Sequence, residues 1–294
     1  AAARPGEILV TDMVRALARR LEDVGFDEVG ERRLKGIDAP VLVHRVVDLT
    51  AAPIPVPSRV AGERGTPIVG RAAQLTTFDH AWSAARTGSS GVLVFEAHPG
   101  FGATRLLAEC AARAHDDRGI VLAGRCSSGL GPPYEPFVEA FREVTALDDE
   151  LERALRDPAT PLARLFPGST AGTADAHPGA ARHELFDAVV DLVRRLARLH
   201  PVLLVVDDAQ HAAAPTLRLL EHVVASLRGE RLLVVAGAQH DPAADTAVDG
   251  AGSATREVVD VLRTLPGATA STLEPLSEEA LIELVRAHAP TTSP

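Results

Sequence analysis

A short segment at 97–105 has the residue types that bind phosphate. It reads Ala-His-Pro-Gly-Phe-Gly-Ala-Thr-Arg and follows a run of apolar residues. A phosphate-binding loop has the pattern G-x-x-x-x-G-K-[ST], whose main-chain N–H groups hold the phosphates together with the N-terminus of the next helix. Gly102 and Thr104 fit this pattern. Ala97 replaces the first glycine and Ala103 replaces the lysine, so the segment predicts a phosphate-binding loop without its lysine.

The missing lysine weakens any contact with phosphate. A charge-assisted hydrogen bond contributes roughly 1.5–3 kcal/mol, or on the order of 10- to 100-fold in affinity. Lys35 is the only lysine of the sequence and is remote from the loop, so Arg105 is the cation that could replace it. A tight strand-to-helix turn that binds no ligand is the alternative interpretation. The predicted contacts of the loop with ATP are Pro99, Gly100, Gly102, Thr104 and Arg105.

Two adjacent acids follow a second apolar run. Residues 203–206 are Leu-Leu-Val-Val, and Asp207 and Asp208 come next. In nucleotide hydrolases the first acid of such a pair holds Mg²⁺, and the second acts on the attacking water. We therefore expect Thr104 and Asp207 to be magnesium ligands, and Asp207 and Asp208 to be the catalytic acids. A solvated strand end, common in α/β proteins, is the alternative.

Apolar runs alternate with helical patterns from residue 67 onward. This alternation predicts an α/β fold of the P-loop NTPase type, in which helices flank a parallel sheet on both faces. The expected strands are 91–96, 120–123, 203–206 and 232–235. The expected helices are 73–86, 104–114, one from 137, 184–199, 216–227 and 277–287, with loops at 158–180 and 241–255.

The first 66 residues differ from the rest. A short strand or turn is expected at 7–10, strands at 26–34 and 41–47, and a helix from 11 to about 20, which makes residues 1–50 a small α/β piece. Prolines and glycines are frequent at 51–66, a composition typical of linkers. We therefore expect 1–50 and 67–294 to be separate domains. The sequence opens within a motif and ends soon after a helix, so we expect it to be part of a longer protein.

Composition excludes several classes of function. The net charge of −10 argues against binding of nucleic acid or an anionic membrane, because both need a basic face. No apolar stretch approaches the ~18 residues that span a membrane. The two cysteines, Cys110 and Cys126, are too few for a disulfide scaffold. We expect both to be small buried residues, and the protein to be cytoplasmic.

Six motifs of this sequence are specific in combination, far more than any one alone. They are Ile-Val-Gly-Arg at 68–71, Pro-Gly-Phe-Gly-Ala-Thr-Arg-Leu-Leu at 99–107, Gly-Arg-Cys at 124–126, Pro-Tyr-Glu-Pro-Phe at 133–137, the acid-pair segment at 202–210 and Leu-Ser-Glu-Glu at 276–279. With these motifs the chain resembles the AAA-like, STAND-type ATPase domains of actinobacterial signalling regulators. Such domains follow nucleotide-cyclase modules or precede LuxR-type DNA-binding modules. The resemblance implies a cytoplasmic module that binds ATP and Mg²⁺, with Arg71 as a further cofactor contact.

The sequence departs from this family at several catalytic positions. Ala72 stands where members have an acid, and Ala238-Gln239-His240 stands where they have a Thr-Tyr-Arg-like sensor. The lysine and the first glycine of the phosphate loop are missing as well. Joint loss at these positions indicates relaxed ATPase function rather than one isolated change.

Residues 1–48 resemble the C-terminal end of a class III nucleotide cyclase. The resemblance rests on Ala-Arg-Pro-Gly-Glu-Ile-Leu-Val at 3–10, Gly-Glu-Arg-Arg-Leu-Lys-Gly at 30–36 and the Pro-Val pair at 40–41. It implies that Lys35 contacts a phosphate at the cyclase site, and an exposed turn lysine is the alternative. It also implies an upstream cyclase domain of the same protein as a partner, and a downstream regulatory domain is a further candidate. The piece is not expected to cyclise ATP unaided.

Three functions remain open from the sequence. The first is a cyclase-linked signalling module that binds nucleotide weakly or not at all and has weak or no ATPase activity. The second is an ATP-hydrolysing switch in which Arg105 replaces the lysine. The third is a protein-interaction scaffold that keeps only the fold. Ala97 and Ala103 favour the first and third, whereas Thr104 and the acid pair keep the second open.

Overall fold

The computed structural model of the chain forms two compact units, Ala1–Ile54 and Pro55–Pro294. The boundary between them falls within the segment 51–66, while the division into functional domains stays a prediction. No helix of the described residues combines the length and apolarity that crossing a bilayer requires. The structure describes residues 9–18, 24–32, 40–48, 67–128, 131–144, 153, 155, 157, 159–166, 178–239 and 251–288.

The N-terminal unit contains a small antiparallel sheet with the strand order β1-β3-β2. Its elements are β1 (Leu9–Thr11), α1 (Asp12–Ala18), β2 (Val24–Arg32) and β3 (Val41–Asp48), close to the predicted ones. The register of β2 shifts between Glu28 and Gly30, and the positive φ of Gly30, 97°, suits this bulge. Helix α1 contacts the sheet through Asp12 Oδ1, which lies 3.1 Å from Nε2 of the buried His44.

The second unit is built on one five-stranded parallel sheet with the order β5-β6-β7-β4-β8. The strands are β4 (Gly91–Ala97), β5 (Ile120–Arg125), β6 (Val202–Asp207), β7 (Leu232–Gln239) and β8 (Ala268–Leu273). The helices are α3 (Ala72–Arg86), α4 (Ala103–Asp116), α5 (Glu135–Val144), α7 (Pro178–Leu199), α8 (Ala214–Ser226), α9 (Ala251–Thr264) and α10 (Glu278–His288), with 3₁₀ turns η3 (Pro161–Leu165) and η4 (Ala209–His211).

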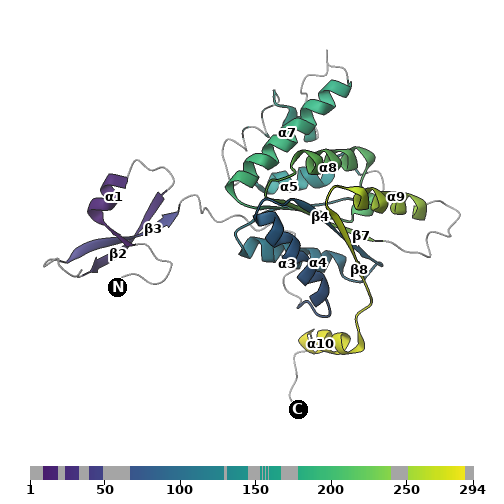
Figure 1. The fold of residues 1–294 in the computed structure, drawn as a ribbon, viewed down its shortest axis with the longest axis horizontal. Coiled ribbons are helices and arrows are strands. Elements are labelled where there is room, and N and C mark those ends of the chain that lie inside the picture. Colours follow the sequence, from purple (N-terminus) through teal and green to yellow (C-terminus); the bar gives the residue numbers. More distant parts are fainter. Residues whose placement is uncertain are drawn as a thin grey trace. The chain divides into compact units, whose positions relative to one another are not determined.

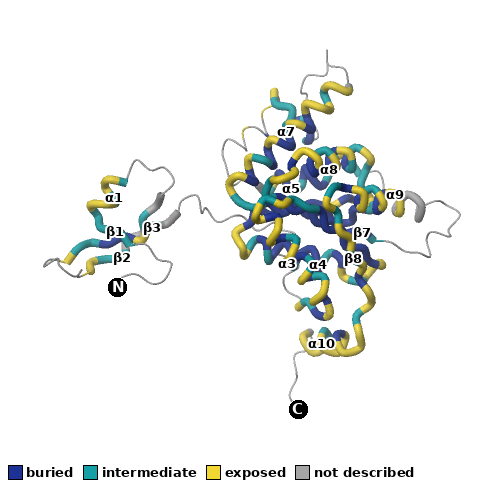
Figure 2. The backbone as a smooth tube through the Cα atoms, viewed as in Figure 1, coloured by how far each residue is buried: buried dark blue, intermediate teal, exposed yellow. Residues whose placement is uncertain are grey.

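Helices cover both faces of this sheet. Helices α3 and α4 lie on one face, and α5, α7, α8 and α9 lie on the other (Figure 1). Strands β4, β6 and β7 are buried almost throughout, as the dark tube in Figure 2 shows. Trp82 of α3 is buried in the core between α3, α4 and the sheet, and Cys110 and Cys126 are buried and free. The predicted α/β fold class is thereby confirmed.

The sequence prediction missed one strand, one helix and the 3₁₀ turns among the described elements, and it misplaced the ends of two loops. Strand β8 has the sequence Ala-Thr-Ala-Ser-Thr-Leu, which contains no apolar run because the strand pairs on one side only and is largely exposed. Helix α9 begins at Ala251, inside the loop predicted at 241–255. Helix α7 begins at Pro178 and η3 forms at Pro161–Leu165, both inside the loop predicted at 158–180.

Candidate functional site: a phosphate loop facing an acid pair

The phosphate loop and the acid pair meet at the carboxyl edge of the sheet. The loop follows β4 and the acids end β6, and β7 lies between these two strands. The carboxyl end of β7 therefore contributes a third part of the site, Gln239. In open α/β sheets, ligands bind outside the carboxyl ends of the strands.

The loop places several N–H groups at the start of α4. Gly100 and Gly102 have φ values of 84° and 88°, which an L-residue adopts only with strain. Phe101 N–H closes a turn on the His98 carbonyl at 3.1 Å, and Gly102 caps the helix. The main-chain N–H groups of Gly102, Ala103 and Thr104 donate no hydrogen bond within the part of the chain that the structure describes. Such unsatisfied donors at a helix N-terminus favour an anion.

The two alanines that depart from the phosphate-loop pattern are buried. Ala97 and Ala103 are 3% and 6% exposed, and both belong to the apolar cluster under α4. Their methyl groups pack inward, and no cationic side chain starts from either position. The loop thus keeps the main-chain part of a phosphate site without its ammonium group.

Thr104 and Asp207, the two predicted magnesium ligands, are in contact. The Thr104 hydroxyl donates to the Asp207 carboxylate at 3.1 Å, although 103 residues separate them in sequence. Asp207 is 3% exposed, and burial together with the neighbouring Asp208 raises its pKa above the ordinary value. A buried carboxylate with a raised pKa is stabilised by a nearby cation.

These oxygens fit Mg²⁺, which takes oxygen ligands and is usually held by one or two protein groups plus substrate phosphates and waters. No group of three or more His, Cys, Asp or Glu residues that could hold a metal occurs in the described ranges. We infer that phosphate oxygens would have to complete the coordination of the ion.

Asp208 is 5% exposed and all its acceptor positions are in use. Its Oδ2 accepts from Arg125 of β5, which forms an ion pair with it through Nε and Nη2. Its Oδ1 accepts from Nε2 of Gln210 at 3.2 Å and of Gln239 at 2.8 Å. A carboxylate offers about four acceptor positions. Activation of a water by Asp208 would require one of these partners to leave.

Arg125, Gln210 and Gln239 were not predicted as site residues. Gln239 N–H also donates to Oε1 of Gln210 at 2.9 Å, so one hydrogen-bonded network joins the ends of β5, β6 and β7. The available signals were the Gly-Arg-Cys motif that contains Arg125 and the unusual residues at the end of β7. Neither pattern shows which acid these side chains contact.

The remaining predicted residues are placed as follows. Pro99 and Gly100 form the turn of the loop, with Gly100 on the wall of a pocket. Arg105 lies on the same wall, and its Nη2 is 3.0 Å from Oε2 of Glu109 on the same helix. Arg71 is 6% exposed, lines the same pocket and donates to two main-chain carbonyls, and its contact with a cofactor stays a prediction. Lys35 lies outside the described residues.

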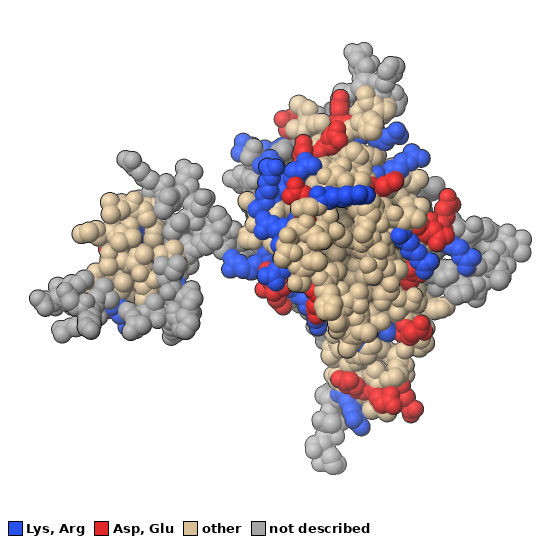
Figure 3. All heavy atoms as spheres, viewed as in Figure 1, with Lys and Arg blue, Asp and Glu red and all other residues tan. Residues whose placement is uncertain are grey.

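An apolar pocket of about 430 Å³ adjoins the loop. It lies between the segment before α3, the phosphate loop and α10, whose exposed side chains include several acids (Figure 3). Ligand sites of small molecules have volumes of this order and are mostly apolar with a few polar groups. The pocket is lined by Pro67, Ile68, Val69, Arg71, Gly100, Phe101, Gly102, Arg105, Pro275, Leu276, Leu281 and Leu284.

Most of the chain is similar to part of a longer curated protein. The chain is 27% identical over 232 residues to "Uncharacterized protein R02095" of Rhizobium meliloti (strain 1021), which covers 73% of the chain and 22% of that protein. The chain thus spans about a fifth of this relative's length.

Among solved structures, Drosophila ORC bound to DNA is similar over 77% of this chain and 99% of that chain, at 12% identity and a TM-score of 0.29. Caenorhabditis elegans PCH-2 is similar over 93% and 72%, at 12% identity and a TM-score of 0.34. The model of the AAA ATPase domain family matches residues 67–235, more than half of the chain. The chain therefore belongs to the AAA ATPase domain family.

Proposed function

We propose that this chain is a nucleotide-binding module with weak or no ATPase activity. The observation that carries the proposal is the contact between Thr104 and Asp207, which joins the start of α4 to the end of β6. The oxygens that would hold a nucleotide-bound Mg²⁺ are together, whereas the lysine that would stabilise the transferred phosphate is absent. The chain would therefore still bind nucleotide although it hydrolyses ATP weakly or not at all.

The pocket beside the loop supports a nucleoside phosphate as the ligand class. Its apolar walls from Ile68, Val69 and Leu276 suit a purine base, and Gly100 and Gly102 place it against the loop. The unsatisfied N–H groups at the start of α4 would bind the phosphates. Base and phosphates would thus be held by different elements, so binding does not depend on the missing lysine alone.

Weak turnover follows from the state of the acid pair. Bound magnesium would neutralise charge on the phosphates and the transferred group. Hydrolysis needs in addition a carboxylate that orients water, and Asp208 is held by Arg125, Gln210 and Gln239. We propose that the Arg125–Asp208 ion pair keeps the domain in a non-hydrolysing state.

An active ATPase that uses Arg105 is the second candidate. One observation favours it: Arg105 lines the pocket next to the loop. Its guanidinium is held by Glu109, so the Arg105 side chain would have to leave this partner to reach a phosphate. A scaffold that binds no nucleotide is the third candidate, and it leaves the Thr104–Asp207 contact without a role.

Turnover and affinity measured together separate these candidates. We expect saturable ATP binding without measurable hydrolysis, and an affinity that Arg105→Met changes less than twofold. A turnover near 1 s⁻¹, within the usual range of enzymes, that is lost in both Arg105→Met and Asp207→Asn would establish the active switch. If ATP does not bind at millimolar concentration, the protein-interaction scaffold is the candidate function that remains.

We also propose that the module belongs to a larger cytoplasmic signalling protein. Its resemblance to actinobacterial STAND-type regulators and the cyclase-like motifs at 3–10 and 30–36 support an upstream class III cyclase domain as partner. A downstream regulatory domain is part of the same proposal. A cyclase assay on the full-length protein, with and without Asp207→Asn, tests the link: equal activity in both would separate the site from the cyclase.

A further inference from the structure

We infer that Arg71 is a positioning residue that orients the phosphate loop and ties it to the segment that leads into α10. The inference rests on the proposed function, because it concerns how the same loop receives phosphate. Three observations support the inference: the two hydrogen bonds of Arg71 to main-chain carbonyls, the absence of an acid beside Arg71 among the described residues, and the close packing of Gly70 on α10.

The charge of Arg71 is buried without an acidic partner. Arg71 as a whole residue is 6% exposed, and within the described ranges no carboxylate lies within ion-pair distance of its guanidinium. An arginine stays charged in proteins, and an unpaired buried charge is costly. A bound anion on the other side of the loop would offset that cost. A fixed positive charge behind the loop would therefore replace part of the attraction that the missing lysine supplied.

The contact with the loop also fixes a peptide orientation. Arg71 Nη2 donates to the Phe101 carbonyl at 2.8 Å. Because the peptide unit is planar and trans, the Gly102 N–H of the same unit points in the opposite direction. A cation at the oxygen end polarises the unit and strengthens its N–H as a donor. Gly102 N–H is one of the unsatisfied donors at the start of α4.

The second hydrogen bond of Arg71 reaches the segment before α10. Nη1 donates to the Glu274 carbonyl at 2.7 Å, just after β8. Next to Arg71, Gly70 has a φ of 64°, and a Cβ there would lie 2.9 Å from Leu276 and 3.0 Å from Ala280. A side chain at position 70 would thus push α10 away. One guanidinium therefore bridges the phosphate loop and the segment that leads into α10, and both of these line the pocket.

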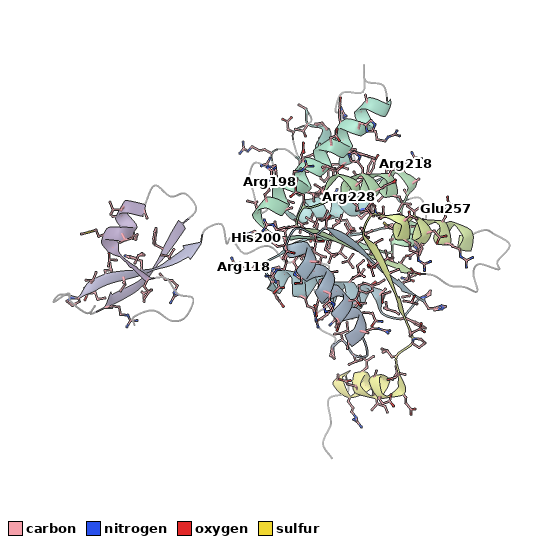
Figure 4. The ribbon with its side chains drawn as sticks, in the orientation of Figure 1. Arg118, Arg198, His200, Arg218, Arg228 and Glu257 are labelled. Carbon is pink, nitrogen blue, oxygen red and sulfur yellow. The ribbon has the colours of Figure 1, made fainter. Side chains whose placement is uncertain are left out.

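Three variants test this bridge: Arg71→Met, Arg71→Lys and the control Arg228→Met. Arg228, labelled in Figure 4, is an exposed arginine before β7 and so lies at the amino ends of the parallel strands, whereas the loop lies at their carboxyl ends. Hydrogen exchange without nucleotide should accelerate about tenfold in Arg71→Met at two places: at the Phe101 amide, which donates to the His98 carbonyl, and in the segment 274–284. Arg71→Lys keeps the charge but carries its donors on a single nitrogen in place of a planar fork, so it should hold one of the two carbonyls and protect one segment only. The control should change neither.

Calorimetry with ATP and adenosine measures the effect on phosphate. The ratio of the two dissociation constants should change about tenfold in Arg71→Met, the scale of one charge-assisted hydrogen bond, and less in Arg71→Lys. Faster exchange in only one segment of Arg71→Met, or an unchanged ratio, would overturn the inference. If Arg71→Met lowers the Tm and weakens the binding of ATP and adenosine equally, the role of Arg71 is purely structural and the inference is overturned as well. Failure of the unsubstituted protein to bind ATP would contradict the proposed function, while the exchange measurement would still decide whether Arg71 is the bridge.

Discussion

Restoring the lysine by Ala103→Lys should raise the affinity for ATP at least tenfold. Position 103 is the first residue of α4, beside the unsatisfied N–H groups of the loop. A charge-assisted contact contributes roughly 1.5–3 kcal/mol, which corresponds to a dissociation constant lower by about 10- to 100-fold. Ala97→Gly, added to this change, removes the other departure from the loop pattern and should increase the gain.

Ala103→Lys should also lower the stability of the domain, because position 103 is buried. Ala103 is 6% exposed and packs in the core, so a longer side chain there should destabilise the domain by about 1–3 kcal/mol. Each 1 kcal/mol lowers the Tm of a domain of this size by about 2–4 °C. Ala103→Met is the matched control, because it adds similar length without charge and should lower the Tm without improving affinity.

Titration calorimetry with ATP and Mg²⁺, combined with thermal melting, measures both effects. The reasoning is refuted if the double variant Ala97→Gly, Ala103→Lys remains folded and its dissociation constant equals that of the unsubstituted protein. That result would mean that the loop does not have the geometry of a phosphate site.

Three further predictions concern hydrolysis, stability and domain structure. ATP turnover should be negligible, and phosphate release well below 1 s⁻¹ checks this. Asp207→Asn should raise the Tm by about 2–4 °C at neutral pH without Mg²⁺, because it removes a buried charge worth about 1 kcal/mol. The folded-state pKa of Asp207 is raised, so ionisation of Asp207 opposes folding when the pH is above that pKa. The gain in Tm of Asp207→Asn should therefore shrink as the pH falls through that pKa. A gain in Tm that does not depend on pH would contradict the raised pKa. Residues 1–50 alone should not melt cooperatively, since so short a chain buries too little surface. Limited proteolysis of the whole chain should cut near 61–64 and leave a core that starts near Pro67. A fragment 1–50 that folds on its own would contradict the cyclase interpretation.

The central strands could be predicted because each contains an uninterrupted run of apolar residues. Strands β4, β6 and β7 are covered on both faces, and their sequences show it directly. Strand β8 could not be found this way, since its exposed edge position allows Thr and Ser in place of apolar residues. Helix α9 does contain a helical pattern, with Val258, Val259 and Leu262 buried, but it follows an Ala/Gly/Asp-rich stretch that dominated the interpretation.

The site was predictable only where its residues adjoin in sequence. The loop and the acid pair are local motifs that meet through the hydrogen bond between Thr104 and Asp207, while the magnesium site stays a prediction. The partners of Asp208 depend on the strand order β5-β6-β7, which places Arg125 and Gln239 on either side of it. The main-chain role of Arg71 likewise depends on how three distant segments meet.

The magnesium dependence of ATP binding tests the central claim most directly. Thr104 and Asp207 are proposed to hold the ion only together with phosphate oxygens, so calorimetry should detect saturable ATP binding that weakens at least tenfold when Mg²⁺ is removed. In Asp207→Asn this dependence should disappear, while adenosine should bind both proteins equally. No binding of ATP, or binding with the same magnesium dependence in both proteins, would contradict the account.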